Sequence, residues 1–337
     1  MIAPTQLHAR TVLELGERRL IERITARLTT ASWVVVGPGD DAAVVEPERG
    51  ALEVLTTDVQ VEGVHFDRRF VPPDAIGHRA LAVNLSDLAA MGATPRVALL
   101  SLVLPDSLDV RVVDGLMDGL LALAAAQKVV VVGGNISRSP GPMMVDVTAV
   151  GAVKRRRVLT RSGARPGDGV YVTGSIGDAL VGLQSLQTSH GPAPRACQER
   201  YLRPQPRVRA GMLLGKNRAA SACIDLSDGL ADAVRQVAEA SRVGITLDAS
   251  ALPIGDEVRR WHDARGAGAI DAAVGGGDDY ELLFTVRPAH QGRLRGVRRL
   301  LGGLPVTRIG LVTKDRRLLI KTDAGERQLP PGFDHFR

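Results

Sequence analysis

Aspartates stand next to apolar segments at several separate places along this chain, each time beside a turn or a helix start. These stretches are GPGDDAAVV with Asp40 and Asp41, LTTDV with Asp58, NLSD with Asp87, DLSD with Asp225 and Asp228, and GGGDDYEL with Asp278 and Asp279. A single aspartate of this kind is typically a helix cap or a turn residue, and Asp228 before GLADAV is predicted to be an N-cap. Because strand ends in an open α/β fold converge on the ligand crevice, the repeated placement predicts a shared acidic site.

Converging carboxylates require positive charge nearby. Two carboxylates about 4 Å apart repel each other by roughly 1 to 4 kcal/mol at effective dielectric constants of 80 to 20. Oxygen ligands without histidine or cysteine favour Mg²⁺, which is usually shared with substrate phosphates. The pattern therefore predicts nucleotide phosphates bridged to the protein through Mg²⁺, with Thr56 and Thr57 supplying further oxygen atoms beside Asp58.

The predicted elements fall into two α/β halves. The basic run Lys154–Arg157 and the turn-rich segment RSGARPGDG interrupt the pattern, so we expect domains over 1–153 and 154–337. NLSDLAA in the first half and DLSDGLA in the second echo each other, although so short a match does not establish a duplication.

Hydrophobic periodicity predicts the individual elements. In the first half we expect helices over 17–28, 74–92 and 107–127, and strands over 34–36, 42–45, 51–59, 96–105, 128–132 and 143–153. Asp74 is expected to cap the second helix, Gly92 to end it, and Gly133 and Gly134 to form a turn. In the second half we expect a strand over 169–174, a helix around 207–214, a strand–turn–helix–strand unit over 221–248 and a strand over 278–286.

Composition narrows the class of partner. The net charge of +6 and the pI of about 9.8 permit nucleic-acid binding, but the basic residues are scattered and aromatic residues make up only 3%. We therefore expect no nucleic-acid partner. No signal peptide or bilayer-spanning stretch is recognised, so no membrane association is expected. Two scattered cysteines, Cys197 and Cys223, favour a cytoplasmic protein with reduced thiols.

The chain has no Walker A sequence and no protein-kinase glycine loop, so a bound nucleotide would be held through aspartates and metal ions. In order, and over nearly the whole chain, its motifs resemble those of the thiamine-monophosphate kinase family. They are GDDAAV, TTDVQVEGVHF, ALAVNLSDLAAMGATP, GGNISRSP, LTRSGARPGD, YVTGSIGDA, IDLSDGLADA, GGGDDYELLFTV and GFDHF.

The resemblance implies a fold, a reaction and partners. The fold would be the two-domain α/β (α+β) fold of aminoimidazole ribonucleotide synthetase-like proteins. Its N-terminal domain would bind ATP and Mg²⁺ and dimerise, and its C-terminal α/β domain would close over the nucleotide. The implied reaction is ATP-dependent phosphorylation of thiamine monophosphate in thiamine diphosphate biosynthesis, carried out by a homodimer with several Mg²⁺ ions.

The resemblance also implies roles for particular residues. The implied metal ligands are Asp41, Thr56, Thr57, Asp58, Asp87, Asp225 and Asp228. The implied nucleotide contacts are Gly134, Asn135, Arg161 and Ser227, and the implied substrate contacts are His65, Asp278 and Phe333. Each of three positions also has an ordinary structural interpretation. A lone histidine such as His65 is as often a packed or capping residue as a substrate ligand. Arg161 would be a solvated surface arginine beside the basic run, and Phe333 would pack the C-terminal tail.

The sequence departs from the family pattern at two of these positions. Asn135 stands where the family commonly has aspartate, so the metal site carries one negative charge fewer. Asp278 stands where the family commonly has glutamate, which keeps the carboxylate but shortens its reach by one methylene.

The expected chemistry fits a motif set rich in aspartate and poor in histidine. The acceptor is a phosphate monoester with a second pKa near 6, so it is largely a dianion at neutral pH and needs no general base. We therefore expect direct in-line transfer, with metal ions and Arg161 aligning the two anions. The alternatives are a synthetase of the same fold, which would call for a reactive N-terminal Cys or Lys absent from residues 1–30, and a metal-dependent phosphohydrolase.

Overall fold

A computed structural model describes residues 11–188 and 194–332. The chain divides into two compact units. Of the described residues, the first unit comprises those up to 47 together with 55–84 and 96–150, and the second comprises 48–54, 85–95 and those from 151 onward. Phe333, which the sequence assigns to the substrate, lies outside the described residues.

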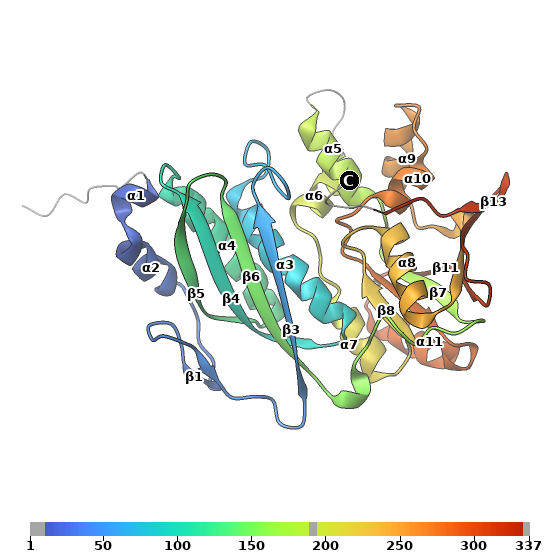
Figure 1. The fold of residues 1–337 in the computed structure, drawn as a ribbon, viewed down its shortest axis with the longest axis horizontal. Helices are drawn as coiled ribbons and strands as arrows, with labels where there is room; N and C mark the ends of the chain where they lie inside the picture. The colour runs from blue at the N-terminus through green and yellow to red at the C-terminus, as the bar shows by residue number, and fades with distance from the viewer. Residues whose placement is uncertain (1–10, 189–193, 333–337) are drawn as a thin grey trace, which may run out of the picture. The chain divides into compact units, whose positions relative to one another are not determined.

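The first unit is built on a four-stranded sheet in the order β3-β6-β4-β5 (Figure 1). Its elements are α1 (Val12–Leu15), α2 (Glu17–Thr25), β1 (Val34–Val36), β2 (Val44–Val45), β3 (Leu52–Val61), α3 (Pro73–Ala90), β4 (Thr94–Pro105), α4 (Val110–Gln127), β5 (Val130–Ser139) and β6 (Met144–Val153), and α3 and three of the strands contribute residues to both units. Strict alternation along β6 buries Val145, Val147 and Ala149 on one face, as expected for a strand with one covered side.

Helices α3 and α4 pack closely because glycines remove side chains from their contact. A Cβ atom on Gly77 would lie 1.8 Å from the carbonyl oxygen of Leu116, and one on Gly119 would lie 1.8 Å from that of Asp74. Helix α3 begins at Pro73, a favoured first helical residue, so the predicted cap Asp74 is wrong and lies within the first turn. Gly92 has a φ of +70°, which fits the predicted helix end.

Strand β5 differs from its prediction. It continues through Gly133 and Gly134 to Ser139, whereas the sequence predicted a turn at the glycines. Strand β5 runs parallel to β4 with a register shift at Ala98 and Leu99, and a Cβ atom on Gly134 would lie 1.8 Å from the Leu100 carbonyl oxygen. These glycines therefore permit close strand pairing.

The second unit contains a seven-stranded sheet in the order β13-β12-β9-β11-β7-β10-β8 (Figure 1). Its strands are β7 (Gly169–Thr173), β8 (Ala222–Asp225), β9 (Gly244–Asp248), β10 (Leu282–Val286), β11 (Val306–Thr313), β12 (Leu318–Thr322) and β13 (Gly325–Gln328). Its helices are η1 (Arg155–Arg157), α5 (Asp178–Gln187), α6 (Arg195–Leu202), α7 (Val208–Lys216), α8 (Leu230–Ser241), η2 (Ala249–Ala251), α9 (Asp256–Asp263), α10 (Ala269–Gly275), η3 (Pro288–His290) and α11 (Gln291–Leu300). An aliphatic core joins β7, β8, β9 and α8, with Val172, Ile224, Val234 and Ile245 among its buried residues.

The direction of β8 and β10 positions two acidic segments together. These strands pair antiparallel, with Asp225 at the end of β8 opposite Leu282 at the start of β10. The segment that follows β8 and the segment that precedes β10 therefore lie at the same end of these two strands. The predicted strand over 278–286 begins only at Leu282, which leaves Asp278 and Asp279 in that connecting segment.

Candidate active site

An open cavity of about 770 Å³ lies in the first unit. Its wall includes the GPGDD turn with Asp40 and Asp41, the β5 residues Gly134 and Asn135, and Thr148 of β6. Apolar side chains of α2, β4 and β5 form much of the remaining wall. The size and the mostly apolar lining with a few polar groups are typical of small-molecule and cofactor sites. The structure thus brings Asp41, a proposed metal ligand, to the same cavity as Gly134 and Asn135, the proposed nucleotide contacts.

Strand β3 separates the predicted ligands Thr56, Thr57 and Asp58. Successive side chains of a strand point to opposite faces, so Thr56 and Asp58 share one face and Thr57 lies on the other. The Thr57 hydroxyl lies 3.0 Å from both an Asp146 carboxylate oxygen and the Thr148 hydroxyl of β6. Asp146 was not singled out in the sequence, because it interrupts an apolar strand without a motif around it.

His65 is held by its own loop in the first unit. Its Nδ1 accepts a hydrogen bond of 3.1 Å from the Val61 amide, and its backbone N–H donates to the Val61 carbonyl at 2.9 Å. An accepting Nδ1 places the proton of the neutral ring on Nε2. The half-buried ring therefore caps the backbone N–H of Val61, and its Nε2 is a hydrogen-bond donor.

The two echoing motifs meet in the second unit. The Ser86 hydroxyl of α3 donates a hydrogen bond of 2.7 Å to a carboxylate oxygen of Asp225, which is only 4% exposed at the end of β8. Burial and then the negative charge of Asp87 raise the pKa of Asp225 to about 7, while Ser86 and Arg161 act in the opposite direction. Ser86 was missed in the sequence, although it occupies the same place in NLSD as Ser227 does in DLSD.

Arg161 is exposed but anchored to α8. One of its Nη atoms donates to the Gln236 side-chain oxygen at 2.5 Å, and Gln236 in turn donates to the Asp232 carboxylate. This arrangement differs from a freely solvated surface arginine. Gln236 and Asp232 lie one helical turn apart on α8, a spacing that the sequence shows. The sequence does not show that Arg161 packs against this helix, so the contact was not predicted.

Asp228 and Asp278 lie in neighbouring segments. Asp228 is not the N-cap of α8, contrary to the sequence prediction, because the helix begins at Leu230 after Gly229. Gly229 has a φ of +90°, and a Cβ atom there would lie 2.3 Å from the Gly276 carbonyl oxygen, so only glycine fits. The Asp278 amide donates to the Ser227 carbonyl at 2.8 Å, which places these two predicted site residues side by side.

Two of the predicted metal ligands, Asp87 and Asp225, lie near each other in the second unit. Within residues 11–188 and 194–332, no group of three or more His, Cys, Asp or Glu side chains is arranged to hold an ion. Asp87 and Asp225 are nevertheless close enough for the charge of one to raise the pKa of the other. The buried carboxylate of Asp225, the partly buried carboxylate of Asp87 and the Ser86 hydroxyl form an oxygen-only donor set, which suits Mg²⁺.

Comparison with known proteins identifies the family. Models of the AIR synthase related protein match twice, the N-terminal domain at residues 39–153 and the C-terminal domain at 165–322. The thiamine-monophosphate kinase of Bacillus subtilis (strain 168) is 35% identical over 96% of this chain and 100% of its own length. The chain belongs to the thiamine-monophosphate kinase family. This confirms the family and the two-domain α/β fold that the motifs predicted.

Solved structures of the thiamine-monophosphate kinase family have the same fold. One from Stenotrophomonas maltophilia K279a has a TM-score of 0.80 at 36% identity and covers 91% of this chain and 96% of its own. AaThiL complexed with AMPPCP and TMP has a TM-score of 0.76 at 35% identity, with coverage of 96% and 98%. In the described part of this family member, no helix is long and apolar enough to cross a membrane.

Proposed function

We propose that this chain transfers the γ-phosphoryl group of ATP to thiamine monophosphate, forming thiamine diphosphate and ADP. The observation that carries the proposal is the meeting of NLSD and DLSD in the second unit, where Ser86, Asp87, Asp225 and Arg161 interact. Family relatives named thiamine-monophosphate kinase match over the full length, and AaThiL binds AMPPCP, an ATP analogue, together with TMP. Both findings support the same reaction.

Mg²⁺ is the proposed cofactor. In the second unit Asp87 and Asp225 would hold it, with Asp228 nearby in sequence, and in the first unit Asp41, Thr56, Thr57 and Asp58 are the proposed ligands. When bound, the ions would neutralise phosphate charge and polarise the transferred group. The raised pKa of Asp225 supports this assignment, because a buried carboxylate beside a second one favours a nearby cation.

Nucleotide and acceptor contacts are proposed for the residues that the family motifs assign to them. Gly134 and Asn135 border the cavity of the first unit, and Arg161 and Ser227 belong to the second unit. Gln236 holds the Arg161 guanidinium, so its positive charge is presented in a set direction to phosphate oxygens. His65 and Asp278 are the proposed acceptor contacts, together with Phe333.

The proposed reaction needs alignment more than proton transfer. An oxygen of the acceptor phosphate attacks the γ-phosphorus, the bond to the β–γ bridging oxygen breaks, and ADP leaves. Because the acceptor is already a dianion near pH 7, no side chain has to remove a proton. The transfer is direct, without a phosphorylated enzyme, and Arg161 offsets the repulsion between the two anions. The proposed setting is the cytoplasm, where the buried thiols of Cys197 and Cys223 would stay reduced.

One assay tests the proposed function. The protein is incubated with ATP and Mg²⁺, with and without thiamine monophosphate, and ADP and thiamine diphosphate are quantified. We expect ADP to form in step with thiamine diphosphate and only when the acceptor is present. ADP released without the acceptor would instead identify a phosphohydrolase. A chiral γ-phosphorus should invert, and retention would contradict direct transfer.

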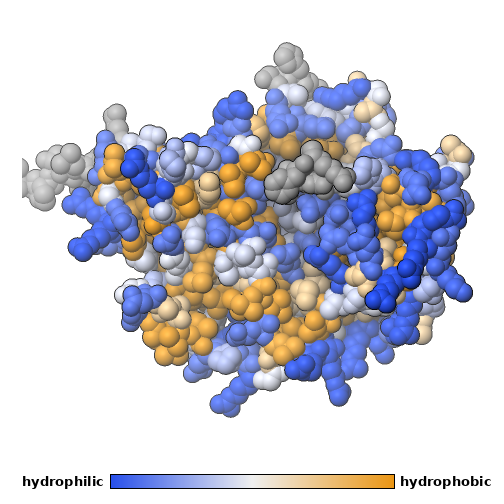
Figure 2. Space-filling view, viewed as in Figure 1, coloured by the Kyte–Doolittle hydropathy of each residue, from blue (hydrophilic) through white to orange (hydrophobic). Residues whose placement is uncertain are grey.

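We also propose that the chain is a homodimer formed through the open face of the first unit's sheet. Figure 2 shows hydrophobic side chains gathered over this sheet and β1. On β3, Leu55 is 67% exposed and Val59 is 44% exposed, both on the face that carries Thr57. An apolar sheet face of this kind typically marks a protein interface, and a second copy paired by twofold symmetry would cover it.

Replacing Leu55 by glutamate should weaken the dimer. A charge at the centre of an apolar interface should raise the dimer dissociation constant by about 30-fold or more. Size-exclusion chromatography with light scattering measures the mass over a dilution series. Leu13→Glu is the matched control, because Leu13 is equally exposed but lies on α1, and it should remain dimeric. A wild-type protein that is monomeric at micromolar concentration would contradict the proposal.

A further inference from the structure

The segment Gly276–Glu281 has an unusual backbone. Asp278 has a φ of +67° and Tyr280 a φ of +50°, both in the left-handed region. Such values are uncommon for residues other than glycine and are true outliers for a bulky aromatic residue. Strained residues of this kind persist only where the surrounding structure fixes them, and they concentrate at ligand sites.

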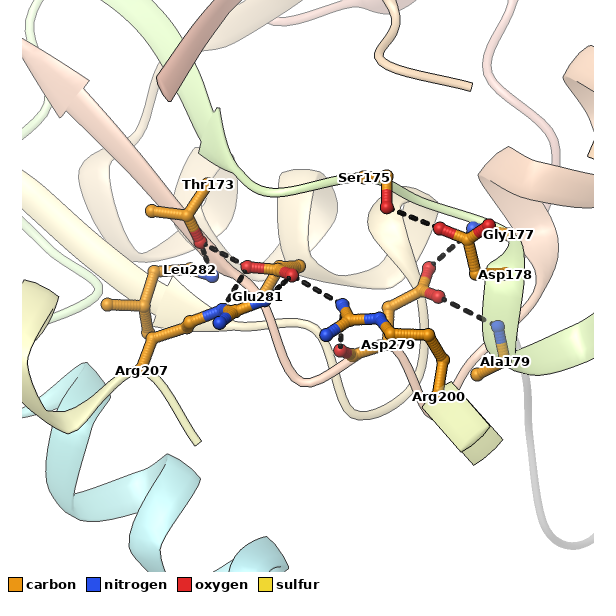
Figure 3. A network of polar contacts seen from close by, with 10 residues as sticks. All are labelled: Thr173, Ser175, Gly177, Asp178, Ala179, Arg200, Arg207, Asp279, Glu281 and Leu282. Atoms are coloured by element: carbon orange, nitrogen blue, oxygen red, sulfur yellow. Dashed lines mark hydrogen bonds and ion pairs between the residues drawn. The ribbon is translucent and has the colours of Figure 1, made fainter. Parts of the chain in front are cut away.

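Asp279, between these two residues, fastens the segment to the start of α5. Its side chain is buried and accepts hydrogen bonds from the Gly177 amide at 2.8 Å and the Ala179 amide at 3.4 Å (Figure 3). These amides are among the first of the helix and have no partner within it, so the carboxylate serves as their cap. The Asp279 side chain therefore ties this segment to the start of α5.

Glu281 fastens the other end of the segment, and it is fully buried. Its carboxylate accepts from the Thr173 hydroxyl at 2.6 Å, from Arg207 Nε at 2.6 Å and from Arg200 Nη2 at 2.5 Å (Figure 3). The Thr173 hydroxyl also accepts from the Leu282 amide at 2.9 Å, which joins the network to β10. Two arginines on one carboxylate hold this position firmly.

The consequence is a fixed Asp278 carboxylate. The Tyr280 hydroxyl donates to an Asp278 carboxylate oxygen at 3.0 Å, and this contact exists because the left-handed backbone turns Tyr280 back toward Asp278. The amides of Asp278 and Tyr280 donate to the carbonyls of Ser227 and Leu226 at 2.8 and 3.0 Å. These bonds place the backbone of Asp278 and Tyr280 beside the DLSD segment, while Tyr280 holds the Asp278 carboxylate.

We propose that Tyr280, Asp279 and Glu281 are positioning residues that preset Asp278 for binding the acceptor. The proposal rests on the proposed role of Asp278 in the function above. A carboxylate already held in its binding orientation loses little conformational freedom when the acceptor arrives, so affinity for the acceptor rises. We expect the effect on the acceptor, because the hydrogen bonds from this segment to Ser227 and Leu226 end on backbone carbonyls.

A double-mutant cycle tests this. Tyr280→Phe keeps the ring and removes only the hydroxyl, and Asp278→Asn removes the carboxylate charge. We expect each change to raise the KM for thiamine monophosphate about tenfold while the KM for ATP stays within about twofold. The double variant should be no worse than Asp278→Asn alone, because Tyr280 acts through Asp278. Asp279→Asn, which preserves shape, should follow the same pattern.

The controls separate positioning from folding. Tyr171→Phe removes a buried tyrosine hydroxyl that hydrogen-bonds Gln291 elsewhere in the second unit, and it should leave both KM values unchanged. If Tyr280→Phe changes the melting temperature or both KM values equally, or adds fully to Asp278→Asn, the positioning proposal is overturned. If Asp278→Asn itself leaves the acceptor KM unchanged, the proposed substrate role of Asp278 fails and the proposal falls with it. If wild-type protein forms no thiamine diphosphate, the proposed function fails.

Discussion

Replacing Asp225 by asparagine should lower kcat/KM at least about a hundredfold, because it removes a proposed Mg²⁺ ligand while keeping the size of the side chain. The metal-free variant should be as stable as wild type or more so. Asp225 is buried beside Asp87, and its raised pKa shows that its ionised form is unfavourable in the folded protein. An amide at this place relieves that repulsion and can still accept from Ser86. Steady-state kinetics and thermal unfolding with EDTA measure the two effects.

The same carboxylate predicts a pH dependence. The folded-state pKa of Asp225, about 7, lies above its usual value of 3.8, so the folded protein binds this proton more tightly than the unfolded chain. Stability of the metal-free protein should therefore fall as pH rises from about 4 to about 7. Mg²⁺ has to displace the proton below pH 7, so its affinity should increase with pH up to that point. Both dependences should flatten in Asp225→Asn.

The control is the same change at an exposed aspartate of the second unit. Asp263→Asn on α9 should leave activity, stability and Mg²⁺ affinity as they are in wild type. Calorimetric Mg²⁺ titrations in two buffers of different ionisation enthalpy detect the released proton. Near-normal activity in Asp225→Asn, or an unchanged pH slope, would contradict the assignment of Asp225 to the metal.

Replacing Glu281 by alanine should lower the free energy of unfolding by about 3 to 5 kcal/mol. The change leaves the mostly buried guanidinium groups of Arg200 and Arg207 without their shared counter-charge, and the Thr173 hydroxyl without its acceptor (Figure 3). Removing one partner of a buried ion pair is far more damaging than never having the pair, because the remaining charges stay desolvated. Urea unfolding followed by circular dichroism measures the loss.

Glu199→Ala provides the matched comparison. Glu199 pairs with Arg203 one turn away on α6, and its side chain is 58% exposed. An exposed pair of this kind contributes little, so the change should shift the free energy of unfolding by about 0.5 kcal/mol or less. Equal losses in the two variants would mean that burial does not control the strength of the Glu281 network.

Much of the local structure follows from local patterns in the sequence. Hydrophobic periodicity predicted β3, β4 and β6, and the placement of aspartates beside strand ends predicted that acidic residues converge. In the structure the charge of Asp87 on α3 acts on Asp225 at the end of β8, a strand of a mostly antiparallel sheet. Local errors arose where glycine was interpreted as a turn signal, as at Gly133 and Gly134, which instead pair within β5.

The sequence by itself determined the family, most of the strands and helices of the first unit, and the residue types that suit phosphate and Mg²⁺ chemistry. Only the tertiary structure decided that Glu281 meets Arg200 and Arg207, which lie 81 and 74 residues away. It also decided that Tyr280 turns back onto Asp278. Hydrophobic periodicity and turn preference act over a few residues. Strand register and the pairing of buried charges depend instead on which segments, distant in the sequence, pack against each other and bury these groups from water.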